Sequence, residues 1–323
     1  MAEPVRKMPA DWEQESAPQN VDPFRYGWRW KCVRLPSGEE TLQQIPLTAE
    51  DLLDPQLGDE VPQSDPHYEL SLVLGEILRR LYASREDVFV AGDLKMLWGI
   101  PGLPEPSPDL AVIPGVRKKR DSARTVFDLI KEGTRPCLVL EVVSSTDAET
   151  RRNDYEKKVK IYERVGIPEY IILDPPTPVT KERLLLTGHR LGPDGRYSGI
   201  EPDREGRLLS ETTGLLFGVA EDGQTIRIFH AATGEPLLSP SELEEIYKAA
   251  AERAEREAEA RAAAEERAER EAEARTAAEE RAEREAEARA AAEERAEREA
   301  EARKNAEAEL ARLSAELERL RGV

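Results

Sequence analysis

Residues 137–175, CLVLEVVSSTDAETRRNDYEKKVKIYERVGIPEYIILDP, decide the fold. An apolar run from Cys137 to Val143 opens the segment, a second apolar run closes it, and a charged helical pattern lies between them. Short apolar runs bounded by turn residues predict buried strands, and strand, helix and strand in succession predict a right-handed crossover. The first strand carries one acid, Glu141, at its centre. Because burying an unpaired carboxylate costs several kcal/mol, Glu141 needs a cation, a metal or a hydrogen-bonding partner.

The flanking residues predict a single α/β domain around a mixed sheet, spanning residues 24–240. Residues 25–47 indicate a hairpin, and Thr48 can cap a short helix that ends near Pro55. An amphipathic helix of about sixteen residues is predicted from apolar side chains at helical spacing: Leu70, Val73, Leu74, Ile77, Leu78 and Leu81. Further strands are expected in DVFVAG, LKMLW, PDLAVIP, RLLLTG, RLLSETTGLLFGVA and TIRIFHAATG. Residues 1–23 are polar, and we expect them to form a loose arm.

Residues 241–323 are almost entirely Ala, Glu and Arg and predict a long charged helix. The motif AEERAEREAEAR repeats every fourteen residues, and Glu four residues ahead of Arg recurs in pairs such as Glu266/Arg270 and Glu271/Arg275. A helix of about 80 residues is expected. Leucines at 3-4-3 spacing, Leu310, Leu313, Leu317 and Leu320, form a coiled-coil stripe near its end. We expect weak homodimerisation through this stripe.

Composition narrows the classes of function. The net charge is −19 over 323 residues, and both halves are acidic, since the tail alone has 26 Glu against 17 Lys and Arg. This charge argues against a protein that coats nucleic acid with a generally basic surface. Cys32 and Cys137 are too far apart in sequence for a zinc motif or a disulfide framework. With no signal-like or membrane-length apolar segment, we expect a cytoplasmic protein without a membrane contact.

Two acids and a lysine are candidates for chemistry. The motif SPDL places Asp109 at the start of the strand LAVI, and if this strand neighbours LVLEVV, then Asp109 and Glu141 meet at one end. Two carboxylates facing a cleft suit Mg²⁺ or Mn²⁺, with water and phosphate oxygens completing the octahedron. Asp154, Lys158 and Tyr162 share one face of the following helix, so Lys158 can point its ammonium back towards Glu141. There it would orient a water or neutralise charge on phosphorus.

These residues carry a family resemblance. PDLAVI followed by LVLEVVSSTDAETRRNDYEKKVKIYERVGIPEYIILDP resembles the Uma-two family of restriction endonucleases, in the PD-(D/E)XK nuclease superfamily. The close match spans about Pro108 to Pro175. The resemblance implies a restriction-endonuclease-like core that hydrolyses phosphodiester bonds of DNA. It also implies that Asp109, Glu141 and the carbonyl of Val142 hold the metal.

The resemblance also assigns the lysine. In the superfamily it usually lies two residues after the second acid, where this chain has Val143, and the family's displaced lysine matches Lys158. The chain departs from the family in residues 144–146, where it has Ser-Ser-Thr in place of the usual SPS. This departure affects the expected shape of that loop but not the expected metal ligands.

Each assignment has a structural alternative. Glu141 can be a structural acid paired with Lys158, Asp109 a turn residue after Pro108, and Lys158 one of several solvated lysines. Asp154 is expected to support the helix or pair with Lys158 rather than bind metal.

Other charged residues are weaker candidates. Arg151, Arg152 and the cluster at residues 117–120 can contact phosphate but are more typical of plain surface. A third acid from the early helix, Glu69 or Glu76, is a minor option. His67, His189 and His230 lack metal-ligand spacing and are expected on the surface or in loops.

Two hypotheses of function follow. The first is a Mg²⁺-dependent DNA endonuclease that uses Asp109, Glu141 and the displaced Lys158. The alternative is a catalytically inactive nuclease-like scaffold that assembles through its C-terminal helix.

Overall fold

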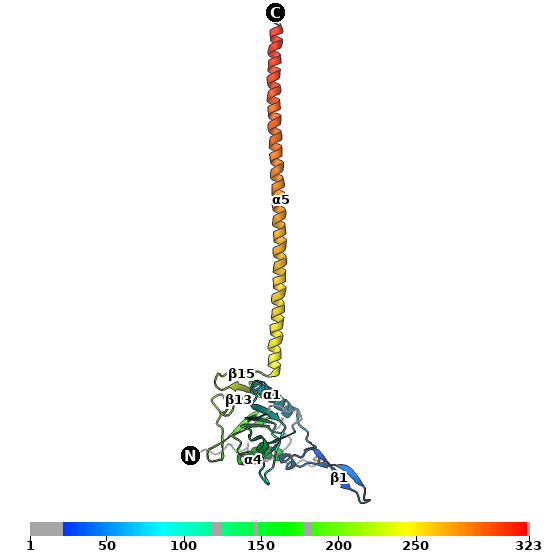
Figure 1. Ribbon diagram of the computed structural model, residues 1–323, viewed down its shortest axis with the longest axis vertical. Coiled ribbons are helices and arrows are strands. Elements are labelled where there is room, and N and C mark those ends of the chain that lie inside the picture. Colours follow the sequence, from blue (N-terminus) through cyan, green and yellow to red (C-terminus); the bar gives the residue numbers. More distant parts are fainter. Residues whose placement is uncertain (1–21, 118–124, 145–147, 177–182, 322–323) are drawn as a thin grey trace. The chain divides into compact units, whose positions relative to one another are not determined.

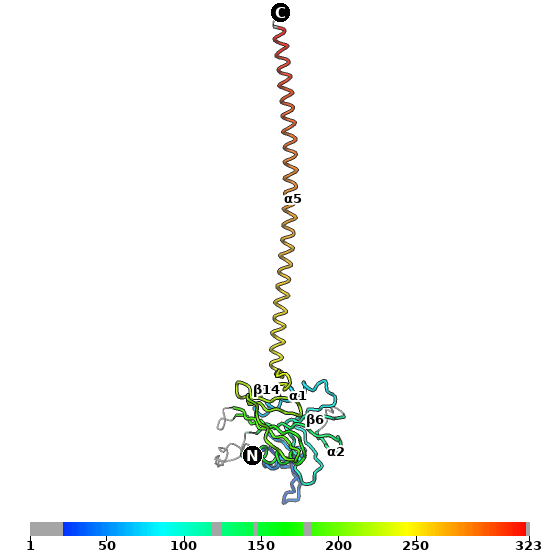
Figure 2. The backbone as a smooth tube through the Cα atoms, turned by 90° about the vertical axis from the view of Figure 1, so that its left-hand side faces the viewer, coloured from blue at the N-terminus to red at the C-terminus, as the bar shows by residue number. Residues whose placement is uncertain are grey.

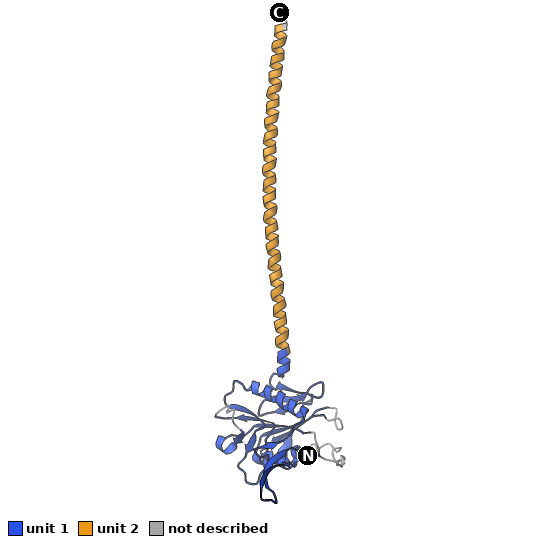
Figure 3. Ribbon diagram, turned by 90° about the vertical axis from the view of Figure 1, so that its right-hand side faces the viewer, with its two compact units in different colours: residues 1–244 blue, residues 245–323 orange. Residues whose placement is uncertain are grey.

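The computed structural model describes residues 22–117, 125–144, 148–176 and 183–321. The chain forms two compact units, one up to Glu244 and one from Glu245 onward (Figure 3). Nearly all of the expected N-terminal arm, residues 1–23, lies outside the described residues.

A six-stranded mixed sheet forms the centre of the first unit. Figure 2 traces the path of the backbone through this unit. Its pair β8–β9 is parallel and its other neighbouring pairs are antiparallel, as the crossover pattern predicts. β8 and β9 are buried along their whole length. In spatial order the strands are β11 (Tyr197–Gly199), β10 (Leu185–Leu191), β9 (Glu169–Asp174), β8 (Leu138–Val142), β6 (Leu110–Pro114) and β4 (Val88–Gly92).

Helices cover both faces of this sheet. On one face the stripe of α1 (Asp65–Leu81) packs against Leu138, Leu140 and Val142 of β8. On the other face, α4 (Lys158–Val165) packs in the cluster that contains Val139 and Val143. Because successive side chains of a strand alternate between faces, Glu141 lies on the α4 side.

The crossover from β8 to β9 is helical but interrupted. It consists of α3 (Ala148–Arg152), a π-helical turn η3 (Asn153–Lys157) and α4. The sequence predicted a continuous helix here. α4 ends at Gly166, which has φ 79°, a left-handed conformation that favours glycine.

Smaller elements surround the sheet. The predicted hairpin is β1 (Trp28–Arg34) with β2 (Glu40–Pro46), extended by β3 (Asp59–Glu60), and it projects from the unit in Figure 1. The predicted short helix after Thr48 is the 3-10 turn η2 (Asp51–Leu53). The remaining elements are β5 (Lys95–Leu97), β7 (Val126–Asp128), α2 (Leu129–Glu132), β12 (Leu208–Ser210), β13 (Leu215–Val219), β14 (Ile226–His230) and β15 (Pro236–Leu237).

The tail is one helix, α5 (Pro240–Arg321), of 82 residues. Ion pairs between side chains four residues apart line it, including the predicted Glu266–Arg270 and Glu271–Arg275. The leucine stripe at its end is exposed, from 53% at Leu313 to 73% at Leu320. Across the described part of the chain, no helix combines the length and apolar character needed to cross a membrane.

Candidate active site

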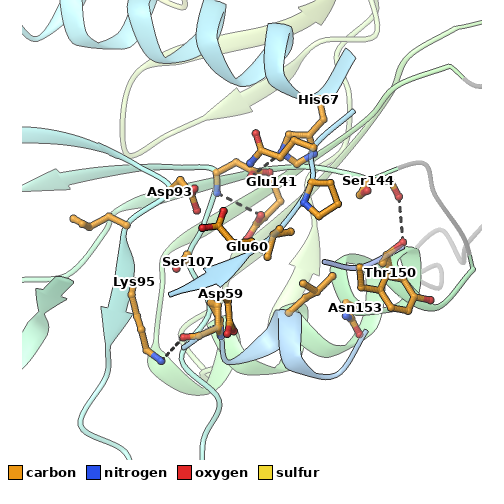
Figure 4. Close-up of a pocket in the computed structure, with 18 of the residues that line it drawn as sticks. Asp59, Glu60, His67, Asp93, Lys95, Ser107, Glu141, Ser144, Thr150 and Asn153 are labelled. Atoms are coloured by element: carbon orange, nitrogen blue, oxygen red, sulfur yellow. Dashed lines mark hydrogen bonds and ion pairs between the residues drawn. The ribbon is translucent and has the colours of Figure 1, made fainter. Parts of the chain in front are cut away.

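A cavity of about 670 Å³ opens at the end of the sheet where β8 finishes and β6 begins. β3, the first turn of α1, the loop after β4 and the turn η3 complete its wall (Figure 4). Its charged lining includes the candidates Asp109, Glu141 and Lys158. The antiparallel pairing of Leu110 with Leu140 places Asp109 beside Glu141. The two acids and the lysine therefore converge on one cavity.

Two side chains contact the carboxylate of Glu141, a residue that is only 1% exposed. The hydroxyl of Tyr162 donates to Oε1 at 2.6 Å, and the ammonium of Lys158 lies 2.9 Å from Oε2. These contacts answer the question raised by an acid in the middle of a buried strand. Both partners come from α4, which packs on the face to which Glu141 points.

Asp109 is held by backbone and side-chain donors. The backbone N–H of Val142 donates to Oδ2 at 2.7 Å, and His67 Nε2 lies 2.9 Å from Oδ1. Its own backbone N–H points to Glu141 Oε2 at 3.5 Å. Burial alone would raise the pKa of Asp109, but the hydrogen bond and charge of His67 outweigh it, so the pKa is lowered and the carboxylate is ionised.

Lys158 links the acids. Its ammonium lies 2.8 Å from Asp154 Oδ1 as well as against Glu141. Burial opposes its charge, but the carboxylates of Asp154, Glu141 and Asp109 raise the pKa of Lys158. Lys158 is therefore a cation throughout the physiological range, and Asp154 pairs with it as the sequence predicted.

The cavity has more negative than positive charge. Six of its lining residues are acids, against Arg25, Lys95, Lys158 and His67. Four of the acids lie close to one another, and their neighbouring cations are Lys158 and His67. Burial and the charges of Asp109 and Asp154 raise the pKa of Glu141 to about 8, and burial also raises the pKa of Asp154. The four acids are Asp93, Asp109, Glu141 and Asp154.

The donor set fits a hard divalent cation. Carboxylate and carbonyl oxygens are the preferred ligands of Mg²⁺, which commonly takes one or two carboxylates and completes its octahedron with water and phosphate oxygens. The described residues contain no group of three or more His, Cys, Asp or Glu arranged to hold a metal. Two carboxylates, from Asp109 and Glu141, line the cavity together with Val142. This number of carboxylates matches the coordination that Mg²⁺ usually has in proteins.

His67 is a site residue that the sequence reasoning missed. It was expected on the surface, whereas it is 8% exposed and contacts Asp109. Burial lowers its pKa, but the hydrogen bond and charge of Asp109 prevail, so the pKa of His67 is raised. The signal was present: His67 precedes Leu70 and Leu74 by three and seven residues and so extends the buried stripe of α1.

Other weaker candidates are now placed. Glu69 and Glu76 are exposed on α1 and do not line the cavity. His189 was also expected on the surface but is buried between Tyr170 and Tyr197. Arg151 is not surface either, since it is buried in an ion pair with Asp174.

Two expected loops fall partly outside the described residues. Of the basic cluster 117–120 only Arg117 is described, and of the departing segment 144–146 only Ser144. Ser144 lines the cavity, and its carbonyl accepts a hydrogen bond from Thr150 at 3.3 Å.

Comparison with known proteins identifies a family. The Uma2 model, described as "Putative restriction endonuclease", matches residues 40–227. Three solved chains match, among them a crystal structure described as a "putative nuclease belonging to DUF820 from Anabaena variabilis". It is 17% identical, covers 46% of this chain and 73% of its own, and has a TM-score of 0.32, too remote to carry an argument. No curated protein matches the chain.

Proposed function

The chain belongs to the Uma2 family, which is described as "Putative restriction endonuclease", and from this premise we propose that it is a divalent-metal-dependent DNA endonuclease that hydrolyses phosphodiester bonds. The observation that supports this proposal most is the meeting of Asp109, Glu141 and Lys158 in one acidic cavity. Three residues that are separated in sequence come together in the arrangement that this chemistry requires.

Asp109, Glu141 and the carbonyl of Val142 would hold the metal, Mg²⁺ or Mn²⁺. The bound ion would supply charge neutralisation for the scissile phosphate and lower the pKa of a water. His67 and the N–H of Val142 fix the Asp109 carboxylate, and Tyr162 fixes that of Glu141. Each carboxylate oxygen has a second lone pair, so these hydrogen bonds leave ligand capacity.

Lys158 provides the positive charge of the site. Its side chain is 13% exposed, and its ammonium is already oriented by Asp154 and Glu141. A fixed ammonium beside the phosphate stabilises the charge that develops during hydrolysis and can orient the attacking water. Asp154 acts on Lys158 rather than on the metal.

One observation favours the alternative, an inactive nuclease-like scaffold. Lys158 and Tyr162 already satisfy Glu141, so the carboxylate is accommodated as a structural ion pair would be. The cluster of acids favours the metal site instead, because Asp93, Asp109, Glu141 and Asp154 have only Lys158 and His67 as neighbouring cations among the described residues.

A cleavage assay separates the two functions. Full-length protein is incubated with supercoiled plasmid and with short duplexes in Mg²⁺, in Mn²⁺ or in EDTA. A nuclease nicks or linearises plasmid with either metal and is silent in EDTA. If the plasmid stays intact in both metals while duplex binding persists, the scaffold function holds.

A further inference from the structure

A second, basic groove lies at the far end of α4 from the active site. Its volume is about 630 Å³. Its walls come from the loop before β8, the last turn of α4 and the loop between β10 and β11. The charged lining residues are Arg135, Lys160, Glu163, Arg164 and Arg196.

The acid that lines this groove, Glu163, already has partners. Glu163 Oε1 pairs with Arg196 at 2.9 Å, and Oε2 accepts the backbone N–H of Tyr197 at 2.7 Å. The hydrogen bond from Tyr197 and the charge of Arg196 lower the pKa of Glu163, so it is ionised. The neighbouring Asp194 accepts the backbone N–H of Arg196 at 3.1 Å.

Three cations remain without a carboxylate partner among the described residues: Arg135, Lys160 and Arg164. Arg135 is fixed, because its Nη1 donates to the carbonyl of Val165 at 2.9 Å and lies over Gly166. Lys160 and Arg164 are exposed on α4. The net charge of the chain is −19, so a groove with three cations that lack a carboxylate partner differs in charge from the protein as a whole.

We propose that this groove binds phosphate. A guanidinium anchored on backbone carbonyls keeps further N–H donors for an anion, and two exposed cations beside it supply charge. Although the protein as a whole is acidic, the groove is a local basic surface that can attract an anion.

The phosphate has two sources that share this chemistry. α4 has eight residues and is therefore about 12 Å long, with Lys158 at one end and the groove at the other. This length corresponds to about three to four base-pair steps along one strand of a DNA duplex. The backbone of DNA held at the active site can therefore extend to the groove. Free phosphate is the other source. The DNA source rests on the proposed nuclease function, whereas the free phosphate source does not.

The test uses the full-length double variant Lys160→Ala/Arg164→Ala. A variant of equal charge change, Lys131→Ala/Arg204→Ala, is the control, since neither side chain lines the groove. Binding of a labelled duplex is measured by anisotropy in EDTA across a salt series, and binding of inorganic phosphate is measured by calorimetry. EDTA removes any metal contribution, so failure of the groove is distinguishable from failure of the metal site.

If the groove contacts DNA, the double variant binds duplex about tenfold more weakly, and the slope of log affinity against log salt falls by about 2. If the ligand is free phosphate, only the calorimetric binding is lost. In both cases the control matches the wild type. The proposal is overturned if the double variant retains wild-type binding of both ligands, or if the wild type binds neither.

Discussion

At the residue scale, the acid inside a buried strand is the most informative feature of the chain. The sequence predicted that Glu141 needs a partner and that Lys158 can reach it, because strand and helix periodicity fix which way each side chain points. It could not predict Tyr162 as a second donor or His67 as the partner of Asp109. Both contacts depend on how α4 and α1 pack against the sheet: helical spacing indicates the face on which each side chain lies, but not which acid it meets.

His67 gives the first prediction. If it holds Asp109 in position for a metal, then His67→Leu weakens Mn²⁺ binding about tenfold or more, as loss of a partner behind a metal ligand usually does. His67→Gln keeps an N–H donor at a similar reach and stays closer to the wild type. Calorimetric titration with Mn²⁺ measures both variants. Equal affinity for His67→Leu and wild type, with unfolding unchanged, would show that His67 only fills space.

His189 predicts an acid sensitivity that has no connection with catalysis. Burial lowers its pKa from 6.5 to about 4, so the unfolded chain takes up its proton first as the pH falls. Above about pH 6.5 the neutral His189 does not reduce the unfolding free energy. As the pH falls from about 6.5 towards 4, its titration lowers the unfolding free energy by at most roughly 3 kcal/mol. His189→Phe keeps the ring between Tyr170 and Tyr197 and removes the titration. Urea unfolding at several pH values should show a flatter acid limb for the variant, and an identical limb would contradict the assignment.

At the element scale, the crossover between β8 and β9 shows which features the pattern of apolar and charged residues predicts. Its helix and parallel strands followed from the sequence. The π-helical turn at 153–157 did not, because it keeps helical spacing with only one altered turn. It lies where Asp154 joins the site. The three-residue strands β7 and β11 were not predicted, since strands this short carry too little periodicity.

An ion pair that ties this crossover to β9 gives the element-scale prediction. Arg151 of α3 is buried against Asp174, which also accepts from the hydroxyl of Tyr155 at 2.9 Å. Arg151→Met removes one member and should lower the unfolding free energy by about 3–5 kcal/mol. The neighbouring exposed Arg152→Met should change it by about 0.5 kcal/mol or less. Urea denaturation compares them, and equal small effects would mean that the buried pair contributes little.

At the scale of the whole molecule, composition alone separated an ordinary globular head from a charged helix. The Ala/Glu/Arg repeat has no buried stripe of its own, which is why its helix is exposed along its length. The exposed leucines at its end are the part suited to another copy of the chain. What they contact does not follow from the pattern.

The tail therefore carries a prediction about assembly. Deleting residues 305–323 removes the stripe from Leu310 to Leu320 and should convert a weak, concentration-dependent dimer into a monomer. The remaining helix, with its ion pairs four residues apart, should keep its far-ultraviolet signal. Sedimentation equilibrium over a concentration range measures the change. A truncated protein that still sediments as a dimer would place the interface in the head.

The central claim, that Asp109, Glu141 and Lys158 form a metal-dependent nuclease site, is tested most directly by the cleavage rate of Glu141→Gln. This change removes the charge and a proposed metal ligand at nearly constant volume, so the account predicts loss of Mg²⁺-dependent duplex cleavage with unchanged folding. Val143→Ala is the control on the same strand face: it loses packing, about 2 kcal/mol of unfolding free energy, and keeps cleavage. A folded Glu141→Gln protein that cuts duplex at the wild-type rate would contradict the account.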